Sequence, residues 1–300
     1  MADLAFVGLG AMGSRLAKRL LDAGYTVTGY NRTAEKARAL VDSGMKLATT
    51  PREAAAAADV VFTMVTDNDA LRAVSYGADG VLAGLRGGAT LVEMSTVGPD
   101  VTRELGEAIA ARGAIMLDAP VSGSTVSVEQ GVASIQVGGD AAALERVRPY
   151  LAVMGPNGIT HVGPLGIAKA MKVATNLGVA VQILAFCEAV ALAEKSGITR
   201  EAAVEALMRS VIASPLVKYR GPFVLGKMAE HVSFPVPMIQ KDLQLALDQA
   251  RAVGVPLPLT ALTQEWMTKA RAMGLGDYDF AVVFDVFAAM SGLPPAPKNV

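Results

Sequence analysis

A glycine-rich loop near the start of the chain constrains the fold more strongly than any other feature. Gly8, Gly10 and Gly13 form a GxGxxG pattern that follows a β-like apolar run at residues 4–7 and opens a helical pattern at residues 12–23. In such a loop the first glycine permits a tight turn, the second lets the backbone approach a pyrophosphate, and the third lets helix and strand pack closely. A structural glycine turn in another α/β fold is the alternative. The pattern predicts a dinucleotide-binding loop made of Gly8, Leu9, Gly10, Ala11, Met12 and Gly13.

The first half of the chain alternates short strands with helices, whereas the second half is almost purely helical. The predicted strands are residues 4–7, 26–30, 60–65, 90–94, 115–117 and 133–137, and the helices between them include residues 34–43, 101–111 and 141–152. Such alternation predicts a parallel sheet covered on both faces. We therefore expect an α/β chain, with a doubly wound Rossmann-type domain at residues 1–164 and an all-helical domain at residues 165–300. The boundary is placed at residues 163–166 (GPLG), because glycine and proline punctuate structure most strongly.

The helix predicted at residues 166–196 joins the two halves and is apolar nearly all round. A membrane span needs about 20 consecutive apolar residues. Charged or amide side chains interrupt this segment at Lys169, Lys172, Asn176, Gln182 and Glu188. We therefore expect a buried helix that lies between domains or subunits, not a membrane span. This expectation favours a homodimer or homotetramer, and a monomer that wraps the helix is the alternative. Shorter helices are predicted at residues 200–210, 237–253, 260–273 and 280–290.

Composition excludes several classes of protein and site. Lys and Arg total 27 against 28 Asp and Glu, so the chain lacks the basic footprint of a nucleic-acid-binding protein. The single cysteine, Cys187, allows neither an intrachain disulfide nor a thiolate zinc site, and two histidines are too few for most histidine-rich metal sites. We expect no metal, a cytoplasmic protein without a signal peptide, and a core position for Cys187. Neither His161 nor His231 is expected to be catalytic.

The residues that end the second predicted strand bear on the choice of dinucleotide. NAD-selective sites place Asp or Glu there to bind the ribose 2′-hydroxyl. This chain has Asn31, Arg32 and Thr33 instead. No carboxylate would repel a 2′-phosphate, and Arg32 and Thr33 could bind one. The sequence therefore favours NADP(H), with NAD(H) possible, and predicts that Asn31, Arg32 and Thr33 bind the cofactor. The alternative is that Arg32 is a solvated surface residue and Asn31 caps the next helix.

Catalytic candidates lie near the predicted junction of the two domains. Residues 118–124 (DAPVSGS) follow a strand, while Lys172 and Asn176 lie four residues apart on the long helix and so share a face. A lysine on a mostly buried helix is costly unless it has a partner or a purpose. Such a lysine can donate a proton to an alkoxide that forms beside a nicotinamide. Lys169 fits equally well on spacing alone, and Lys172 could instead extend its ammonium to solvent.

The whole chain resembles the β-hydroxyacid dehydrogenase family, which includes 3-hydroxyisobutyrate dehydrogenase and glyoxylate/succinic semialdehyde reductases. The shared motifs, in order, are residues 6–13 (FVGLGAMG), 94–97 (MSTV), 118–123 (DAPVSG), 171–176 (MKVATN) and 240–247 (QKDLQLAL). The resemblance implies that Lys172 is the catalytic lysine. It implies that the substrate is a small carboxylate-bearing aldehyde or ketone, or the matching hydroxy acid. It further implies substrate contacts by Ser122, Gly123, Thr96, Asn176, Phe234 and Asp242, and cofactor contacts by Val65, Thr66, Thr96 and Lys241.

Departures from the family pattern leave the identity of the substrate open. Residues 124–128 (STVSV) replace a glycine- and alanine-rich turn, Thr175 stands in place of an asparagine, and Thr66 stands where many members have proline. Two rival functions remain: an imine reductase, a class that generally lacks this lysine, and a non-catalytic NADP-binding interaction protein. Residues 218–220 are expected to form a solvated helix end, and residues 294–297 (PPAP) a loose tail.

Overall fold

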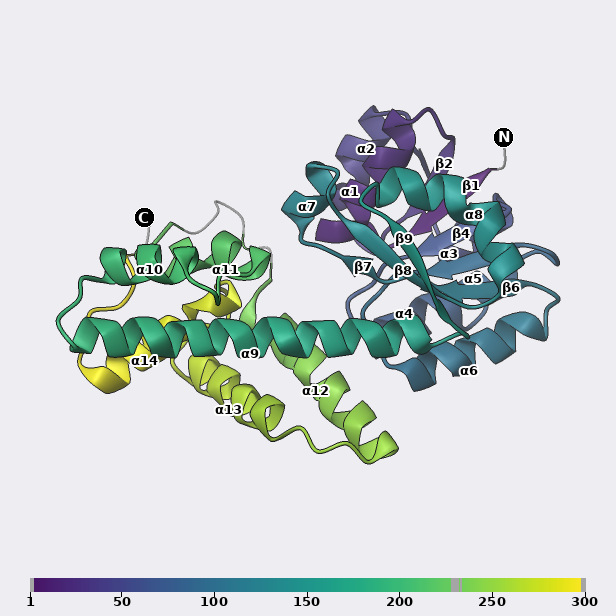
Figure 1. Cartoon of the computed structure of the whole chain (residues 1–300). Coiled ribbons are helices and arrows are strands. Elements are labelled where there is room, and N and C mark those ends of the chain that lie inside the picture. The colour runs from purple at the N-terminus through teal and green to yellow at the C-terminus, as the bar shows by residue number, and fades with distance from the viewer. Residues whose placement is uncertain (1–2, 228–231, 233, 298–300) are drawn as a thin grey trace. The chain divides into compact units, whose positions relative to one another are not determined.

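The computed structural model describes residues 3–227, 232 and 234–297, and the chain divides into two compact units. The first unit, residues 1–172, contains all the strands described, and the second, residues 173–300, is helical (Figure 1). The expected fold class, a Rossmann-type α/β sheet followed by a helical portion, is confirmed. The division into units falls inside the long helix, past the glycine and proline residues at 163–166.

The sheet of the first unit has the strand order β3-β2-β1-β4-β5-β6-β8-β7, with β9 paired to β8. The strands are β1 (Leu4–Val7), β2 (Val27–Tyr30), β3 (Lys46–Leu47), β4 (Val60–Thr63), β5 (Thr90–Glu93), β6 (Ile115–Asp118), β7 (Val121–Ser122), β8 (Ser134–Gly138) and β9 (Ile159–Gly163). From β3 to β6 every pairing is parallel, but β8 runs antiparallel to β6 and β7. The strand order reverses between β1 and β4, and ligands of open α/β sheets bind at the carboxyl ends of strands flanking such a point.

Strand β1 shows why the sheet is buried on both faces. Leu4 and Phe6 pack into one hydrophobic core with residues of α1 (Ala11–Asp22) and α8 (Ala141–Met154). Ala5 and Val7 point the other way, into a core with residues of α3 (Pro51–Ala56) and α6 (Pro99–Ala110). Because alternate residues face opposite sides of a strand, a strand covered on both sides must be an unbroken apolar run.

Several short elements of the first unit were not predicted, and hydrogen-bonded caps define two of them. Thr50 Oγ1 accepts from the Glu53 N–H at the start of α3, and Asp67 accepts from the Ala70 N–H at the start of α4 (Asn68–Ser75). Such caps fix short helices that have too few residues to show a clear hydrophobic period. The other unpredicted helices of this unit are α5 (Val81–Gly84) and α7 (Thr125–Glu129), while η1 (Ala34–Ala37) and α2 (Arg38–Asp42) cover the helix predicted at residues 34–43.

Helix α9 (Ile167–Lys195) begins in the first unit and continues into the second. By length and composition it could span a membrane, with a mean hydropathy of 1.8 in its most apolar window, of which 44% is buried within the chain. Ala180, Ile183 and Val190 lie in the core of the second unit. The other helices are α10 (Arg200–Arg209), α11 (Pro215–Arg220), η2 (Gly221–Leu225), α12 (Val236–Val253), α13 (Pro258–Ala272), η3 (Phe280–Val282) and α14 (Val283–Ser291).

Two expectations for the second unit are wrong, the first of them in part, since Lys218 is exposed as expected. Arg220 is not solvated: it is 5% exposed and forms an ion pair with buried Asp279 at 3.1 Å. The described part of the tail is not loose either, because Arg200 donates hydrogen bonds to the carbonyl oxygens of Pro294 and Pro295, and the Ala296 N–H donates to Asp285. In both cases the segment forms an ion pair or hydrogen bonds with a buried charged side chain on a distant element. The local sequence does not reveal such a partner.

Candidate active site

The three glycines of the loop after β1 meet different surroundings. A Cβ on Gly8, whose φ is +97°, would overlap the Met64 carbonyl oxygen, and a Cβ on Gly13 would overlap the Gly8 carbonyl oxygen. A Cβ on Gly10 would meet no atom within 4 Å. The fold itself therefore requires Gly8 and Gly13, whereas Gly10 borders open space. Helix α1 starts at the next residue without a side-chain cap, so its first N–H groups remain for a ligand or solvent. This cradle fits the pyrophosphate of a dinucleotide.

Asn31, at the end of β2, holds the glycine loop. Its Oδ1 accepts from the Leu9 N–H at 2.9 Å, and its Nδ2 donates to the Thr33 carbonyl oxygen at 2.8 Å. Both ends of the side-chain amide are thus engaged within the protein, and Asn31 does not cap the following helix, whose N-cap residue is Thr33. Arg32 is exposed, and within the described part of the chain no hydrogen bond or ion pair holds its guanidinium.

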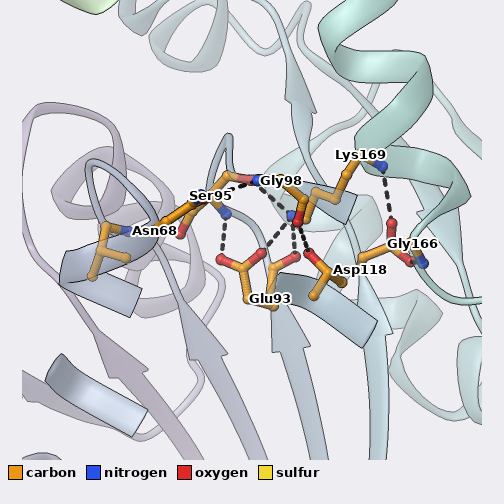
Figure 2. A network of polar contacts seen from close by, with 9 residues as sticks. Asn68, Glu93, Ser95, Gly98, Asp118, Gly166 and Lys169 are labelled. Atoms are coloured by element: carbon orange, nitrogen blue, oxygen red, sulfur yellow. Dashed lines mark hydrogen bonds and ion pairs between the residues drawn. The ribbon is translucent and has the colours of Figure 1, made fainter. Parts of the chain in front are cut away.

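Two fully buried carboxylates lie side by side at the carboxyl ends of β5 and β6 (Figure 2). Glu93 and Asp118 are register partners on these parallel strands. Glu93 Oε1 accepts from the Ser95 N–H at 2.7 Å. Asp118 accepts from the N–H groups of Gly166 at 2.9 Å and Lys169 at 3.0 Å, at the first turn of α9. Asp118 therefore caps α9 and places negative charge at the positive end of the helix dipole.

Lys169 brings its ammonium to the same place. Its Nζ forms an ion pair with Glu93 Oε2 at 2.5 Å and donates to the carbonyl oxygens of Glu93 at 2.9 Å and Ser95 at 2.7 Å. The side chain is fully buried. An ammonium has three N–H donors, and here three oxygens of the protein surround it. Lys169 is therefore sequestered in the interior, whereas Lys172, three residues further along α9, is half-buried.

The loops that follow β4 and β5 are tied to each other. Ser95 Oγ accepts from the Val65 N–H at 2.8 Å, and Asn68 Oδ1 accepts from the Gly98 N–H at 2.9 Å. Figure 2 shows Asn68, Ser95 and Gly98 beside the two carboxylates. Val65 and Thr96 are half-buried and Thr66 is exposed. Two hydrogen bonds therefore join the two loops that carry these predicted cofactor-contacting residues.

Ser122 and Gly123 lie at the end of β7, immediately before α7. Gly123 has a φ of +146°, and a Cβ there would lie 2.9 Å from the Ser127 Cβ. Ser124 and Ser127 form a reciprocal capping box, in which each hydroxyl accepts from the other residue's N–H. Residues 124–128, which depart from the family's glycine- and alanine-rich turn, thus form a capped helical turn. Because Gly123 has no Cβ, Ser127 of this turn can lie close to the backbone of Gly123.

In the second unit, the predicted substrate-lining residues Asn176 and Asp242 contact each other. Asn176 Nδ2 on α9 donates to Asp242 Oδ2 on α12 at 2.5 Å, and Asp242 Oδ1 forms an ion pair with Lys241 at 2.9 Å. Asn176 and Asp242 are 4% and 2% exposed. Phe234 packs edge-to-face on Phe280, with ring centroids 5.5 Å apart. Each residue therefore has a structural partner within this unit.

The residues expected to be non-functional have ordinary structural partners. His161 Nε2 contacts the Gly139 carbonyl oxygen at 2.9 Å, and His231 lies outside the described residues. Cys187 is fully buried, and burial raises the pKa of its thiol far above the usual range. Among the described residues there is no group of three or more His, Cys, Asp and Glu side chains that could hold a metal ion.

Sequence reasoning missed Glu93 and Ser95 as members of the site. Glu93 ends an apolar strand, which is an unfavourable place for a carboxylate unless it is paired. Lys169 is the corresponding unfavourable cation on a buried helix. Each of these two charges is unusual in its apolar surroundings. Because 76 positions separate Lys169 from Glu93, the sequence pattern alone does not indicate that they form an ion pair.

Comparison with known proteins identifies the family. Residues 3–163 match the NAD-binding domain of 6-phosphogluconate dehydrogenase, and residues 166–287 match the NAD-binding domain of NADP-dependent 3-hydroxyisobutyrate dehydrogenase. The chain is 33% identical to glyoxylate/succinic semialdehyde reductase 2 of Arabidopsis thaliana, over 96% of this chain and 80% of the relative. It is also 33% identical to 2-(hydroxymethyl)glutarate dehydrogenase of Eubacterium barkeri, over 97% and 96%.

A solved structure shows the same similarity. Mycobacterium tuberculosis 3-hydroxyisobutyrate dehydrogenase, determined with L-serine, superimposes with a TM-score of 0.83 at 29% identity, covering 95% of this chain and 99% of that chain. The similarity extends over both units, and the glycine cradle lies within the matched dinucleotide-binding domain. The chain therefore belongs to the β-hydroxyacid dehydrogenase family of NAD(P)-dependent oxidoreductases.

Proposed function

We propose that this protein is an NADP(H)-dependent enzyme that interconverts a small hydroxy acid and its semialdehyde. When bound, the nicotinamide supplies or accepts the hydride. The open space beside Gly10, at the uncapped start of α1, supports binding of the pyrophosphate by residues 8–13. Val65, Thr66, Thr96 and Lys241 are the further residues proposed to contact the cofactor.

Lys172 is the proposed proton donor. In the reducing direction its ammonium donates a proton to the carbonyl oxygen, and in the oxidising direction the neutral amine takes that proton back. The observation that carries this assignment is the burial of Lys169 among protein oxygens. Of the two lysines that spacing allows on α9, only Lys172 retains partial exposure.

The preference for NADP(H) rests on the surface around Asn31. Its amide is occupied in holding the glycine loop, which leaves Arg32 and Thr33 as the polar, exposed side chains of this segment. A guanidinium forms strong charge-assisted hydrogen bonds with phosphate oxygens. We expect Arg32→Ala to weaken NADPH binding at least about tenfold, a loss of about 1.4 kcal/mol, and to leave NADH binding unchanged. Isothermal titration with each cofactor measures both, and an equal loss for both would refute the proposal.

The proposed substrate carries a carboxylate close to its reacting carbon. The names of the two curated relatives specify glyoxylate, succinic semialdehyde and 2-(hydroxymethyl)glutarate, which all have a carboxylate. Ser122 and Gly123 are proposed to hold that group, with Thr96, Asn176, Phe234 and Asp242 lining the pocket. We further propose that the protein is cytoplasmic. We also propose that it forms a homodimer or homotetramer, because apolar residues of α9 such as Leu192, at 71% exposure, remain uncovered within one chain.

A substrate panel with matched variants tests the reaction and the lysine together. NADPH absorbance is followed with glyoxylate, succinic semialdehyde, methylmalonate semialdehyde and tartronate semialdehyde. Lys172→Met should lower kcat at least about 100-fold while NADPH still binds. Lys195→Met, at the far end of the same helix, is the control and should keep the activity of the unmodified protein. Normal turnover by Lys172→Met would refute the assignment of the lysine.

The rival functions give different outcomes in the same assay. An imine reductase would consume NADPH with a cyclic imine and not with the semialdehydes. A non-catalytic binding protein would bind NADPH and turn over neither class. Lys172 argues against the first rival, and the presence of Ser122 and Gly123 together with Lys172 and Asn176 argues against the second.

A further inference from the structure

Three backbone segments of the proposed active site start from one buried charge network. The segments are the loop after β4, with Val65 and Thr66, the loop after β5, with Thr96, and the segment after β6, which leads to Ser122 and Gly123. The network consists of the side chains of Glu93, Ser95, Asp118 and Lys169 (Figure 2). The Val65 N–H of the loop after β4 donates to Ser95, the loop after β5 contains Ser95, and the segment after β6 directly follows Asp118.

Lys169 contacts the ends of two of the strands from which these segments start, β5 through its side chain and β6 through its backbone. Its ammonium contacts the Glu93 carboxylate and two backbone carbonyl oxygens, those of Glu93 and Ser95, directly before Thr96. Its backbone N–H donates to Asp118 at the end of β6. Through Ser95, whose hydroxyl accepts from the Val65 N–H, the same network holds the loop after β4.

The charges of the network compensate one another. Glu93 and Asp118 bring two carboxylates to adjacent strands, and both are fully buried with Lys169. The ammonium neutralises Glu93, and the N–H groups at the start of α9 stabilise Asp118. Apart from this ion pair, Glu93 Oε2 has no hydrogen-bond partner among the described residues. Removal of either charge alone therefore leaves the other buried and unpaired.

We propose that Lys169 is a positioning residue, whose ion pair with Glu93 fixes the loops after β4 and β5 in the geometry that the nicotinamide and substrate require. This inference rests on the proposed function for its effect on turnover. The restraint itself lies within the first unit and does not depend on the identity of the substrate. Lys169 acts through the backbone of residues 93–95, whereas Lys172 is the residue proposed to exchange the proton.

The test compares the double variant Lys169→Met/Glu93→Gln with the unmodified protein. Methionine is unbranched and close in length to lysine, and glutamine keeps an oxygen that can accept from the Ser95 N–H. The neutral pair leaves no buried charge uncompensated, so its melting temperature should stay within about 5 °C of the original. Lys169→Met alone should melt lower by on the order of 10 °C. The surface pair variant Arg148→Met/Glu145→Gln, on α8, is the control and should change nothing.

Two readouts together decide the proposal. Amide hydrogen exchange of residues 64–66 and 93–97, measured without cofactor, should become at least tenfold faster in the double variant. With cofactor and substrate, kcat should fall at least tenfold, a larger factor than the rise in the Kd for NADPH, because the loops after β4 and β5 are proposed to position the nicotinamide whereas residues 8–13 are proposed to bind the pyrophosphate. Unchanged exchange would overturn the proposal, and so would faster exchange with unchanged kcat.

Further measurements cover failure of folding and failure of the proposed function. If the double variant does not fold, Ser95→Ala removes only the hydroxyl that accepts from Val65. Faster exchange at Val65 and a lower kcat would then support the proposal, and no change in either would overturn it. If the unmodified protein reduces no semialdehyde, the proposed function fails, and the exchange rates without cofactor still decide whether the ion pair restrains the loops.

Discussion

Gly10 offers a substitution that separates ligand binding from folding. Its backbone, with φ of −73° and ψ of −165°, suits any residue, and a Cβ there would meet no protein atom within 4 Å. Alanine reduces the freedom of the unfolded chain, which stabilises by about 0.4–1 kcal/mol, and is a poorer N-cap than glycine by a similar amount. We therefore expect Gly10→Ala to leave the free energy of unfolding unchanged within about 0.5 kcal/mol. The added methyl would occupy the space proposed for the pyrophosphate.

The assay is thermal unfolding with and without NADPH. At a concentration of about 100 times the Kd, the cofactor should stabilise the unmodified protein by about 2.7 kcal/mol. If Gly10→Ala weakens binding tenfold, the gain at the same concentration falls to about 1.4 kcal/mol. Gly13→Ala is the contrasting variant, because its Cβ would overlap the Gly8 carbonyl oxygen, and we expect it to cost about 1–3 kcal/mol without any ligand. A full NADPH-induced shift in Gly10→Ala would refute the proposed cradle.

The other predictions concern three residues away from the reacting atoms. Arg220→Met should destabilise the protein by about 3–5 kcal/mol in urea unfolding, because Asp279 would remain buried without its cation; wild-type stability would contradict the importance of the pair. Cys187 should not react with a thiol reagent in the native protein and should react once in denaturant, because burial raises the pKa of its thiol; rapid native labelling would contradict this. Asn31→Ala should weaken NADPH and NADH binding alike in titrations, since the Leu9 N–H loses its acceptor, whereas a loss confined to NADPH would assign Asn31 to the 2′-phosphate.

The sequence predicts those parts of the fold that rest on local pattern. The apolar run of β1 and the glycine spacing after it identify the strand, the turn and the helix, and the long apolar segment identifies α9. The sequence does not predict the elements that depend on distant partners. The strands β3 and β9 are defined by pairing with β2 and β8, and their short runs carry no period of their own.

The same distinction applies to the candidate site. The spacing of Lys172 and Asn176 indicates one helix face, but spacing alone does not separate Lys172 from Lys169. Burial separates them, because Lys169 meets Glu93 and the carbonyl oxygen of Ser95 only after the chain has folded. The N-cap of α9 is likewise supplied by Asp118, which lies on another element. Partners that only the tertiary fold brings together have no signature in a single sequence.

The pairing of Lys169 with Glu93 also restricts how this protein can change over evolutionary time. A mutation to a neutral residue at either position leaves the other charge buried without its partner. The resulting loss in the free energy of unfolding is comparable to a large part of a domain's total stability. The two positions should therefore co-vary. Related sequences should carry both charged residues or neither, and sequences with only one of the two charges should be rare.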